Sequence, residues 1–352
     1  MNLSFYLKKL KGLDLSRFTQ TAKRVSAITG KPWRAVLLDI YFCTLKYGSG
    51  HVDYEAFRMY EKNSKQRAEI LTVGKNNKLY KQFNDPRYIN YFESKAMFNK
   101  KFSDFIKRDW MLVGESVMYG ETQGTALPPE ARVEGKGLDD FKAFISDKEY
   151  IIAKPLGLSC GTGIEKIKVS DWDPEKLYDH LVMDSKPLVE EVVKQHETMD
   201  LLCSTSVNTI RVITILKGDV VKIVAGGIRM GQNGIFVDNF NAGGIGVVYD
   251  LKTGVVISDG YDKKRGVYKT VPESGITLKG FQIPLWDQIV QLVDDAARVV
   301  PQVGYVGWDV AVSADKGPLL IEGNSYPGQD NAQEPDLDAG TYGSIMRILY
   351  EG

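Results

Sequence analysis

The chain has 352 residues, of which 43% are hydrophobic and 26% charged, a composition typical of a globular protein with two or three structural units. Its 45 basic and 45 acidic side chains balance, so no overall field recruits nucleic acid or an anionic membrane. The apolar run in residues 1–14 is too short for a secretory signal or a membrane span. Three cysteines without paired spacing and three histidines argue against a disulfide framework and a zinc site. We therefore expect a cytoplasmic protein.

Residues 1–90 have the polar, periodic pattern of helices. RFTQTAKRVSAITG ends at Gly30, and PWRAVLLDIYFCTLKYG has apolar residues at helical spacing and ends at Gly48. This region contains no group of residues typical of a catalytic site. We interpret it as a scaffold or a partner-docking element.

A lysine and a run of glycines follow the next apolar strand. EYIIAKPLGLSCGTGIEKIKV predicts a strand ending at Lys154, a turn with Gly157, Gly161 and Gly163, and a second strand. Glycines let backbone N–H groups approach an anion, and the ammonium neutralises it, so the segment is suited to phosphate. It differs from a P-loop because the lysine precedes the glycines. By itself, the segment fits a plain glycine-rich turn equally well, and Cys160 within it is more simply incidental than catalytic.

PLVEEVVKQHE predicts a strand followed by a polar exit. Taken alone, Glu190 and Glu191 fit an edge strand with solvated carboxylates. The segment comes after Lys154 at the place where a nucleotide-binding protein of two lobes needs a linker that holds the base.

From Val207 onward the sequence predicts strands broken by Gly, Asn and Asp. Arg211 and Arg229 interrupt apolar strands, and an inward-facing arginine needs an anion as partner. Asn239 and Asn241 in DNFNAGG precede two glycines that allow a backbone to approach a ligand, and a plain turn is an equally good interpretation. IPLWDQIVQLVDDAARVVP predicts one long amphipathic helix that stops at Pro301.

Oxygen-bearing side chains mark the last pair of predicted strands. Asp309 lies in VGWDVAV, and Glu322 and Asn324 share one face of LLIEGNS, with a tight turn between the strands. Two carboxylates and an amide suit Mg²⁺ that is shared with phosphate oxygens. The alternative of solvated hairpin residues is weaker, because apolar runs flank both carboxylates and an unpartnered buried carboxylate is costly.

In this order, the segments ESK, YIIAKP with its glycine loop, LVEE, IRV, NFNAGG, WDV and IEGN resemble the ATP-grasp superfamily over residues 91–350. The later segments resemble glutamate ligases that modify ribosomal proteins. The whole chain, including KYGSGHVDYEAFRMY, resembles sugar-transfer-associated ATP-grasp proteins of polysaccharide assembly. The resemblance implies an α+β fold whose two α+β lobes, 91–190 and 191–352, clasp ATP after a mainly helical region, 1–90.

The resemblance also implies a site for ATP and Mg²⁺. Arg211, with Arg229, would face the γ-phosphate and the acyl phosphate formed from it, beside Lys154. The metal would be bound by Asp309, Glu322 and Asn324. The nucleotide would be held by Lys95 and Lys154 at the α- and β-phosphates, by the loop of Ser159, Gly161 and Gly163 over the triphosphate, by Glu190 and the backbone near Val193 at the adenine, and by Glu197 or His196 at the ribose. Asn239 would face the γ-phosphate, and Glu191 and Asn241 would also belong to the nucleotide site.

One position departs from the pattern of D-alanine–D-alanine ligases. These enzymes have an arginine two residues before the aspartate of the metal strand, where it stabilises the tetrahedral intermediate. Here that position is Gly307. Arg211 or Arg229 would have to take its role.

The implied function is an ATP- and Mg²⁺-dependent, ADP-forming carboxylate–amine ligase that works through an acyl phosphate and needs no protein nucleophile. By the resemblance, its small-molecule substrates would be an amino acid and a uronic acid or sugar nucleotide in surface polysaccharide biosynthesis. A peptide or amino-acid ligase unrelated to glycans is the nearest alternative. A nucleotide-binding module without turnover and a phosphotransferase that stops at the phosphorylated substrate are the others.

Overall fold

The computed structural model describes residues 15–118, 132–157, 162–232, 243–264, 266–328, 333 and 341–350. The chain forms two compact units, Met1–Gln82 with Gly328–Gly352 and Phe83–Pro327. Each unit buries an apolar core of its own.

The first unit is helical, as the N-terminal sequence predicts. Apolar residues recur at helical spacing along α2 (Leu15–Thr29) and pack against α3 (Trp33–Tyr47). The other helices of the unit are α4 (His51–Ala56), the 3₁₀ turn η1 (Met59–Glu61), α5 (Ser64–Glu69), α6 (Val73–Phe83) and α14 (Thr341–Tyr350).

Helix α3 ends at the glycine that the sequence indicates. Gly48 has a φ of 70°, in the left-handed region that favours glycine. Its N–H donates to the carbonyl of Thr44. A Cβ at this position would also lie 3.2 Å from the Cα of Gly74, so both the helix stop and the close approach require glycine.

Helix α14 packs against α5 in the first unit. This grouping differs from the expected division, in which residues 191–352 form one lobe with the metal site. Apolar residues at helical spacing along α14 are the reason, since Ile345 and Leu349 are buried there.

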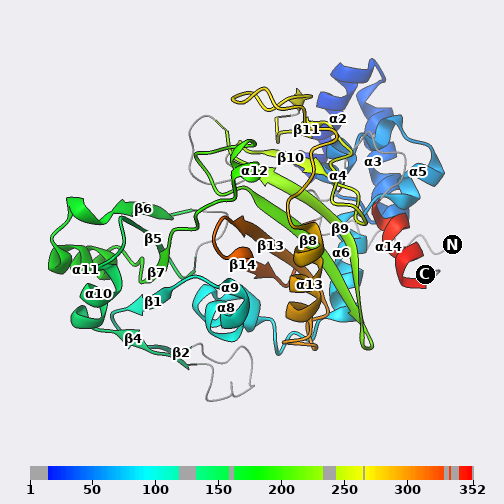
Figure 1. The fold of residues 1–352 in the computed structure, drawn as a ribbon. Coiled ribbons are helices and arrows are strands. Elements are labelled where there is room, and N and C mark those ends of the chain that lie inside the picture. The colour runs from blue at the N-terminus through cyan, green and yellow to red at the C-terminus, as the bar shows by residue number, and fades with distance from the viewer. Residues whose placement is uncertain are drawn as a thin grey trace. The chain divides into compact units, whose positions relative to one another are not determined.

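The second unit begins with three short helices and a smaller sheet. Helices α10 (Leu138–Ile145) and α11 (Pro174–Met183) pack their apolar residues onto one face of this sheet, as can be followed in Figure 1. The strand order is β4-β1-β7-β5-β6, and only β1 and β4 run parallel. The three short helices are α7 (Asn90–Glu93), α8 (Lys95–Lys101) and α9 (Ser103–Ile106). The strands of the smaller sheet are β1 (Trp110–Val113), β4 (Gly135–Lys136), β5 (Tyr150–Lys154), β6 (Glu165–Lys168) and β7 (Leu188–Glu191), and the 3₁₀ turn η3 (Val169–Asp171) follows β6. Strands β2 (Val117–Met118) and β3 (Arg132–Val133) form a separate pair.

The larger sheet of the second unit is antiparallel, with the order β12-β11-β10-β9-β8-β13-β14. Its last two strands form the predicted hairpin, and the predicted amphipathic helix is α13 (Trp286–Ala297). The remaining elements are β8 (Thr209–Lys217), β9 (Val220–Met230), β10 (Ile245–Val248), β11 (Gly260–Tyr261), β12 (Val267–Tyr268), β13 (Tyr305–Ser313), β14 (Gly317–Asn324) and α12 (Glu197–Asp200).

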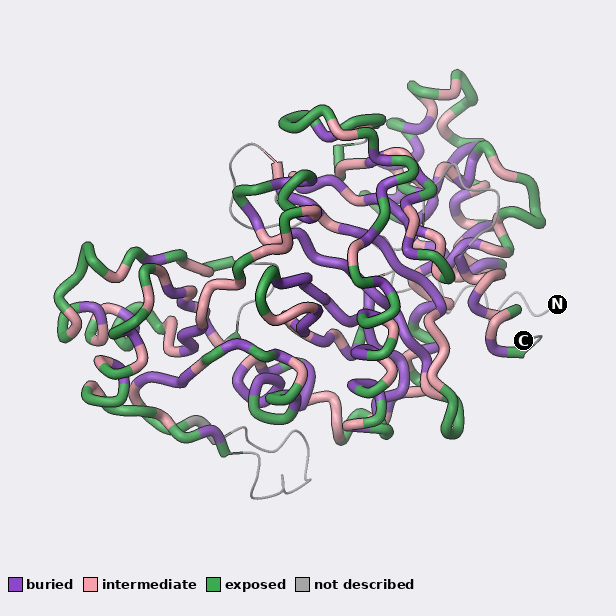
Figure 2. Tube along the Cα trace, viewed as in Figure 1, coloured by how far each residue is buried: buried purple, intermediate pink, exposed green. Residues whose placement is uncertain are grey.

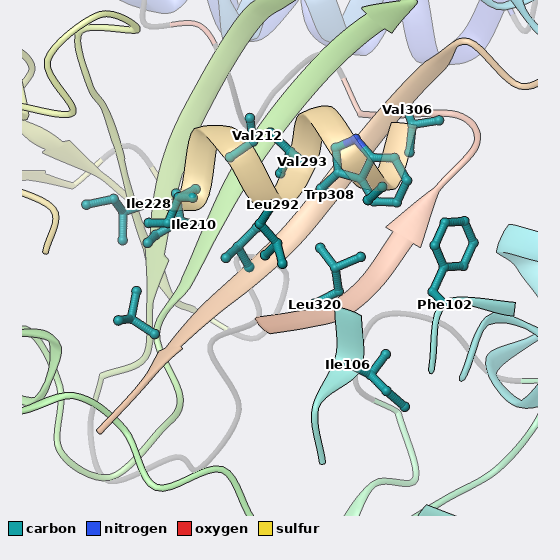
Figure 3. Close-up of a cluster of buried hydrophobic side chains, with 14 of the residues drawn as sticks. Phe102, Ile106, Ile210, Val212, Ile228, Leu292, Val293, Val306, Trp308 and Leu320 are labelled. Atoms are coloured by element: carbon teal, nitrogen blue, oxygen red, sulfur yellow. The ribbon is translucent and has the colours of Figure 1, made fainter. Parts of the chain in front are cut away.

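The two faces of the larger sheet differ in chemistry because side chains alternate along each strand. Figure 3 shows Val212 and Trp308 on the face that packs against Leu292 and Val293 of α13. Residues of opposite parity, among them Arg211 and Asp309, therefore project from the other face. The apolar face anchors the sheet in the core, and the opposite face carries polar groups.

Buried positions are concentrated along the central strands (Figure 2), and every residue of β13 is buried. Among the described residues, none of the helices combines the length and the apolar character needed to cross a bilayer.

Candidate functional site

Strand pairing aligns the polar residues of the larger sheet. Asp309 lies opposite Arg211 on one side and opposite Glu322 on the other. Asn324 lies opposite Gly307, two residues from Asp309. Since directly paired residues and residues two apart share a face, these side chains project from the same face of the sheet.

Two arginines bind the buried carboxylate of Asp309. The Nε and Nη2 atoms of Arg211 donate to its two oxygens at 2.6 Å and 3.0 Å. Nη2 of Arg229 lies 2.6 Å from Oδ2, and the same guanidinium donates to the hydroxyl of Thr209. Burial alone would raise the pKa of Asp309, but the charges of Arg211 and Arg229 lower it to about 2. Asp309 is therefore ionised and supplies the anion that inward-facing arginines require.

Glu322 and Asn324 complete the predicted metal ligands. Nδ2 of Asn324 lies 3.3 Å from Oε1 of Glu322 and 3.5 Å from Oδ2 of Asp309. Burial and the neighbouring carboxylate of Asp309 raise the pKa of Glu322. Two carboxylates and the carboxamide of Asn324, whose oxygen can also act as a ligand, are a set on adjacent strands that fits a hard divalent cation.

Other arrangements of metal ligands are not found in the described part of the chain. There, no group of three or more His, Cys, Asp or Glu side chains is placed to hold a metal ion.

Lys154 and Glu190 lie on the face of the smaller sheet away from α10 and α11. Nζ of Lys154 is 2.5 Å from Oε2 of Glu190. The carboxylate of Glu190 is buried and also accepts hydrogen bonds from Arg108 and from Nδ2 of Asn99, the latter at 2.6 Å. Burial would raise the pKa of Glu190, but Arg108 and Lys154 hold it well below its usual range.

Lys95 belongs to the same electrostatic environment. It is the first residue of α8, whose N-cap is Ser94. Burial lowers the pKa of Lys95, the nearby carboxylate of Glu322 opposes this shift, and the ammonium of Lys154 adds to it. Lys95 is therefore within electrostatic reach of Lys154, the other predicted phosphate-binding lysine, and of Glu322, a predicted metal ligand.

The family model of sugar-transfer associated ATP-grasp proteins matches residues 175–335. Over these residues, somewhat less than half of the chain, the sequence is similar to this ATP-grasp family. The matched segment contains both arginines and the three predicted metal ligands, and it confirms the α+β ATP-grasp fold that the sequence motifs predict. ATP and Mg²⁺ are the cofactors of this superfamily.

Several solved structures are similar to the chain at low identity. They include N5-carboxyaminoimidazole ribonucleotide synthetase in an ADP complex (11% identity, 74% of this chain and 52% of that chain, TM-score 0.43). D-alanine–D-alanine ligase from Coxiella burnetii has 12% identity, covering 74% of this chain and 56% of that chain, with a TM-score of 0.39. L-amino acid ligase from Bacillus licheniformis has 10% identity, covering 74% and 48%, with a TM-score of 0.39. The chain thus spans about half the length of these proteins, and the similarities assign no site residue. No curated protein matches the sequence.

The segment after β7 connects the two sheets of the ATP-grasp unit. The N–H of His196 donates to the carbonyl of Val312 on β13, and Nδ1 of His196 accepts from the N–H of Thr198 at the start of α12. Glu197 is exposed in the first turn of that helix. Glu191 accepts from the N–H of Asp109 and forms an ion pair with Lys316 at 2.6 Å.

The adenine contacts at Glu190 and Val193, the nucleotide contact at Glu191 and the ribose contacts at His196 and Glu197 stay predictions. The contacts that the structure shows for the Glu190 carboxylate are with cations and an amide. Of the predicted loop over the triphosphate, Gly163 has a φ of 76° in the turn before β6. Ser159, Gly161, Asn239 and Asn241 lie outside the described residues.

Sequence reasoning missed Arg108, Asn99 and Thr209. Arg108 binds partners 82 and 212 residues away in the chain, so no local pattern marks it. The sequence feature that could have drawn attention to Arg108 is its place in KRDW, directly before an apolar strand. The anion that binds this arginine can be identified only in the folded structure.

Proposed function

We propose that the chain is an ATP- and Mg²⁺-dependent carboxylate–amine ligase that forms an amide through an acyl phosphate and releases ADP. One observation carries this proposal: a single sheet face of an ATP-grasp segment holds Asp309 between Arg211 and Arg229, next to Glu322 and Asn324. Lys95 and Lys154 add positive charge near this face. Such a set is suited to polyanionic substrates and to a divalent cation.

In this proposal Asp309, Glu322 and Asn324 are the residues that would hold Mg²⁺ at the phosphates of ATP. When bound, the ion offsets negative charge on the phosphates that react. Lys95 and Lys154 bind the phosphates that are retained in ADP. These side chains orient the γ-phosphorus toward the incoming carboxylate.

The proposed reaction has two steps. The substrate carboxylate oxygen attacks the γ-phosphorus of ATP, the bond to the bridging oxygen breaks, and ADP leaves. The amine nitrogen then attacks the acyl carbon and loses a proton, and inorganic phosphate leaves as the amide forms. Arg211 and Arg229 donate hydrogen bonds to the phosphoryl oxygens and to the oxyanion of the tetrahedral intermediate.

The substrates are proposed to be an amino acid and a uronic acid or a similar group of a surface glycan. The description of the matching family as sugar-transfer associated supports the glycan assignment. The paired arginines favour an anionic substrate, which both an amino acid and a uronic acid provide.

The test is incubation of the protein with ATP, Mg²⁺ and panels of amino and uronic acids, with ADP, phosphate and amide products measured. We expect ADP and an amide of one amino acid and one uronic acid, and neither from Asp309→Asn. An amide made from two amino acids would move the assignment to a peptide ligase. Tight Mg-ATP binding without ADP above background would indicate a binding module, and ADP formed without phosphate release on adding an amine would indicate a phosphotransferase.

A further inference from the structure

Arg108 lies in the loop between α9 and β1 and joins the two sheets of the ATP-grasp unit. Its side chain is 2% exposed. Nε and Nη2 donate to the two carboxylate oxygens of Glu190 on β7, both at 3.0 Å. Nη1 donates to the carbonyl of Leu320 at 2.5 Å, and Nη2 to that of Ile321 at 3.2 Å, both on β14. One guanidinium therefore links the strand of Glu190 to the strand of Glu322.

The contact on β14 falls at an irregularity in the strand. Asp309 pairs with Glu322, but Val310 pairs with Leu320, so Ile321 is the extra residue of a β-bulge. Strand β14 is the last strand of its sheet, so carbonyls on its outer edge have no partner strand. Arg108 binds two successive carbonyls there, directly before Glu322.

The contact of Arg108 with Glu190 on β7 adds a second positive charge beside Lys154. Nε of Arg108 and Nζ of Lys154 both approach Oε2 of Glu190. A buried carboxylate needs a cation, and without Arg108 the ammonium of Lys154 would have to stay on Glu190. With Arg108 present, the two cations exceed the charge of the one carboxylate. The cluster then keeps positive charge that Lys154 can offer to a phosphate.

We propose that Arg108 is a positioning residue for Mg-ATP. It balances Glu190 so that Lys154 is available to phosphate, and it anchors β14 immediately before the metal ligand Glu322. This inference rests on the proposed function, because Lys154 and Glu322 matter here as parts of a Mg-ATP site. A lysine at position 108 would keep the positive charge. Its single ammonium could not donate to both oxygens of Glu190 and to the two carbonyls of β14 at the same time.

The test measures Mg-ATP affinity by calorimetry and the melting temperature by fluorimetry for the full chain and its variants. We expect Arg108→Met to weaken Mg-ATP binding by about 10- to 100-fold, the range found for residues that orient ligand-binding groups. Adding Glu190→Gln to Arg108→Met should restore most of the affinity, because the buried carboxylate no longer holds Lys154. Arg108→Lys should weaken binding less than Arg108→Met, and an equal loss in the two would overturn the charge-balancing role.

A matched control lies in the first unit. Arg67 also grips one carboxylate, Asp39, with two nitrogens (2.7 Å and 2.8 Å) and donates to a backbone carbonyl, that of Met59. Arg67→Met should lower the melting temperature and leave Mg-ATP affinity unchanged. If Arg108→Met behaves like Arg67→Met while the parent binds Mg-ATP, the inference fails and the proposed function stands. A parent that does not bind Mg-ATP overturns the proposed function and, with it, the role of Arg108.

Discussion

Nη1 of Arg211 lies 2.9 Å from the place where a Cβ on residue 307 would stand. The Arg211 side chain thus passes directly over Gly307 to reach the carboxylate of Asp309. The glycine that departs from the D-alanine–D-alanine ligase pattern leaves room for an arginine from the neighbouring strand. This supports Arg211 as the residue that faces the reacting group.

Gly307→Ala should therefore lower kcat more than it raises the KM for ATP. The added methyl would displace Arg211 or Pro327, whose Cβ lies 2.9 Å from its position. A misplacement of about 1 Å in a group that stabilises the reacting centre can cost about 100-fold in rate, so we expect a loss of about 10-fold to 100-fold. Steady-state kinetics of ADP release measure the effect. Gly137→Ala is the control, because a Cβ there meets nothing within 4 Å, and its kinetics should match those of the parent.

Glu322→Gln and Asp309→Asn should separate metal binding from stability. Both remove a carboxylate ligand, so both should abolish the Mg²⁺ dependence of nucleotide binding in a calorimetric titration. Asp309 forms buried ion pairs with Arg211 and Arg229. Leaving those arginines without an anion should cost about 3–5 kcal/mol of unfolding free energy in Asp309→Asn. Glu322→Gln should unfold within about 1 kcal/mol of the parent. Retained Mg²⁺ dependence in Glu322→Gln would contradict the assignment.

The free energy of unfolding of the second unit should decrease in acid, because protonation of Glu190 removes its ion pairs. Its folded-state pKa is held below the unfolded value, which is about 4.3 for glutamate. The unfolded chain therefore binds this proton first as the pH decreases. The stabilisation from Arg108 and Lys154 is complete above the unfolded pKa and is lost as the pH falls through the folded pKa. Denaturant titrations between pH 7 and pH 3 should show a shallower acid decrease in Glu190→Gln, and parallel curves would argue against this ion pair.

Thr214→Val should destabilise the larger sheet although valine matches threonine in size. The indole Nε1 of Trp308 donates to Oγ1 of Thr214 at 2.9 Å, and both residues are fully buried. Removing the acceptor leaves a buried N–H without a partner, which costs about 1–3 kcal/mol. Urea unfolding followed by tryptophan fluorescence measures the loss. Thr44→Val is a comparison, since the hydroxyl of Thr44 donates to a carbonyl of its own helix, that of Ile40, and its loss should cost less.

The sequence by itself determined the positions where short-range rules apply. Gly48 ends a helix because the left-handed conformation favours glycine. Alternation along β13 and β14 assigns Glu322 and Asn324 to one face, and the short turn at 314–316 brings Asp309 beside them. The ATP-grasp motifs fall in these regular elements, so their order could be recognised without coordinates.

Only the tertiary structure decided which charges meet. Asp309 is bound by arginines from two other strands, and Arg108 reaches Glu190 and β14 from a loop far away in the chain. Such pairs depend on which strands become neighbours, and strand order is set by the burial of whole sheet faces rather than by any local pattern. The role of Glu190 shows the difference. Its sequence context suggested a contact with adenine, which stays a prediction. Only the fold shows that its carboxylate lies among Arg108, Lys154 and Asn99, because a buried carboxylate is stable only beside cations and hydrogen-bond donors.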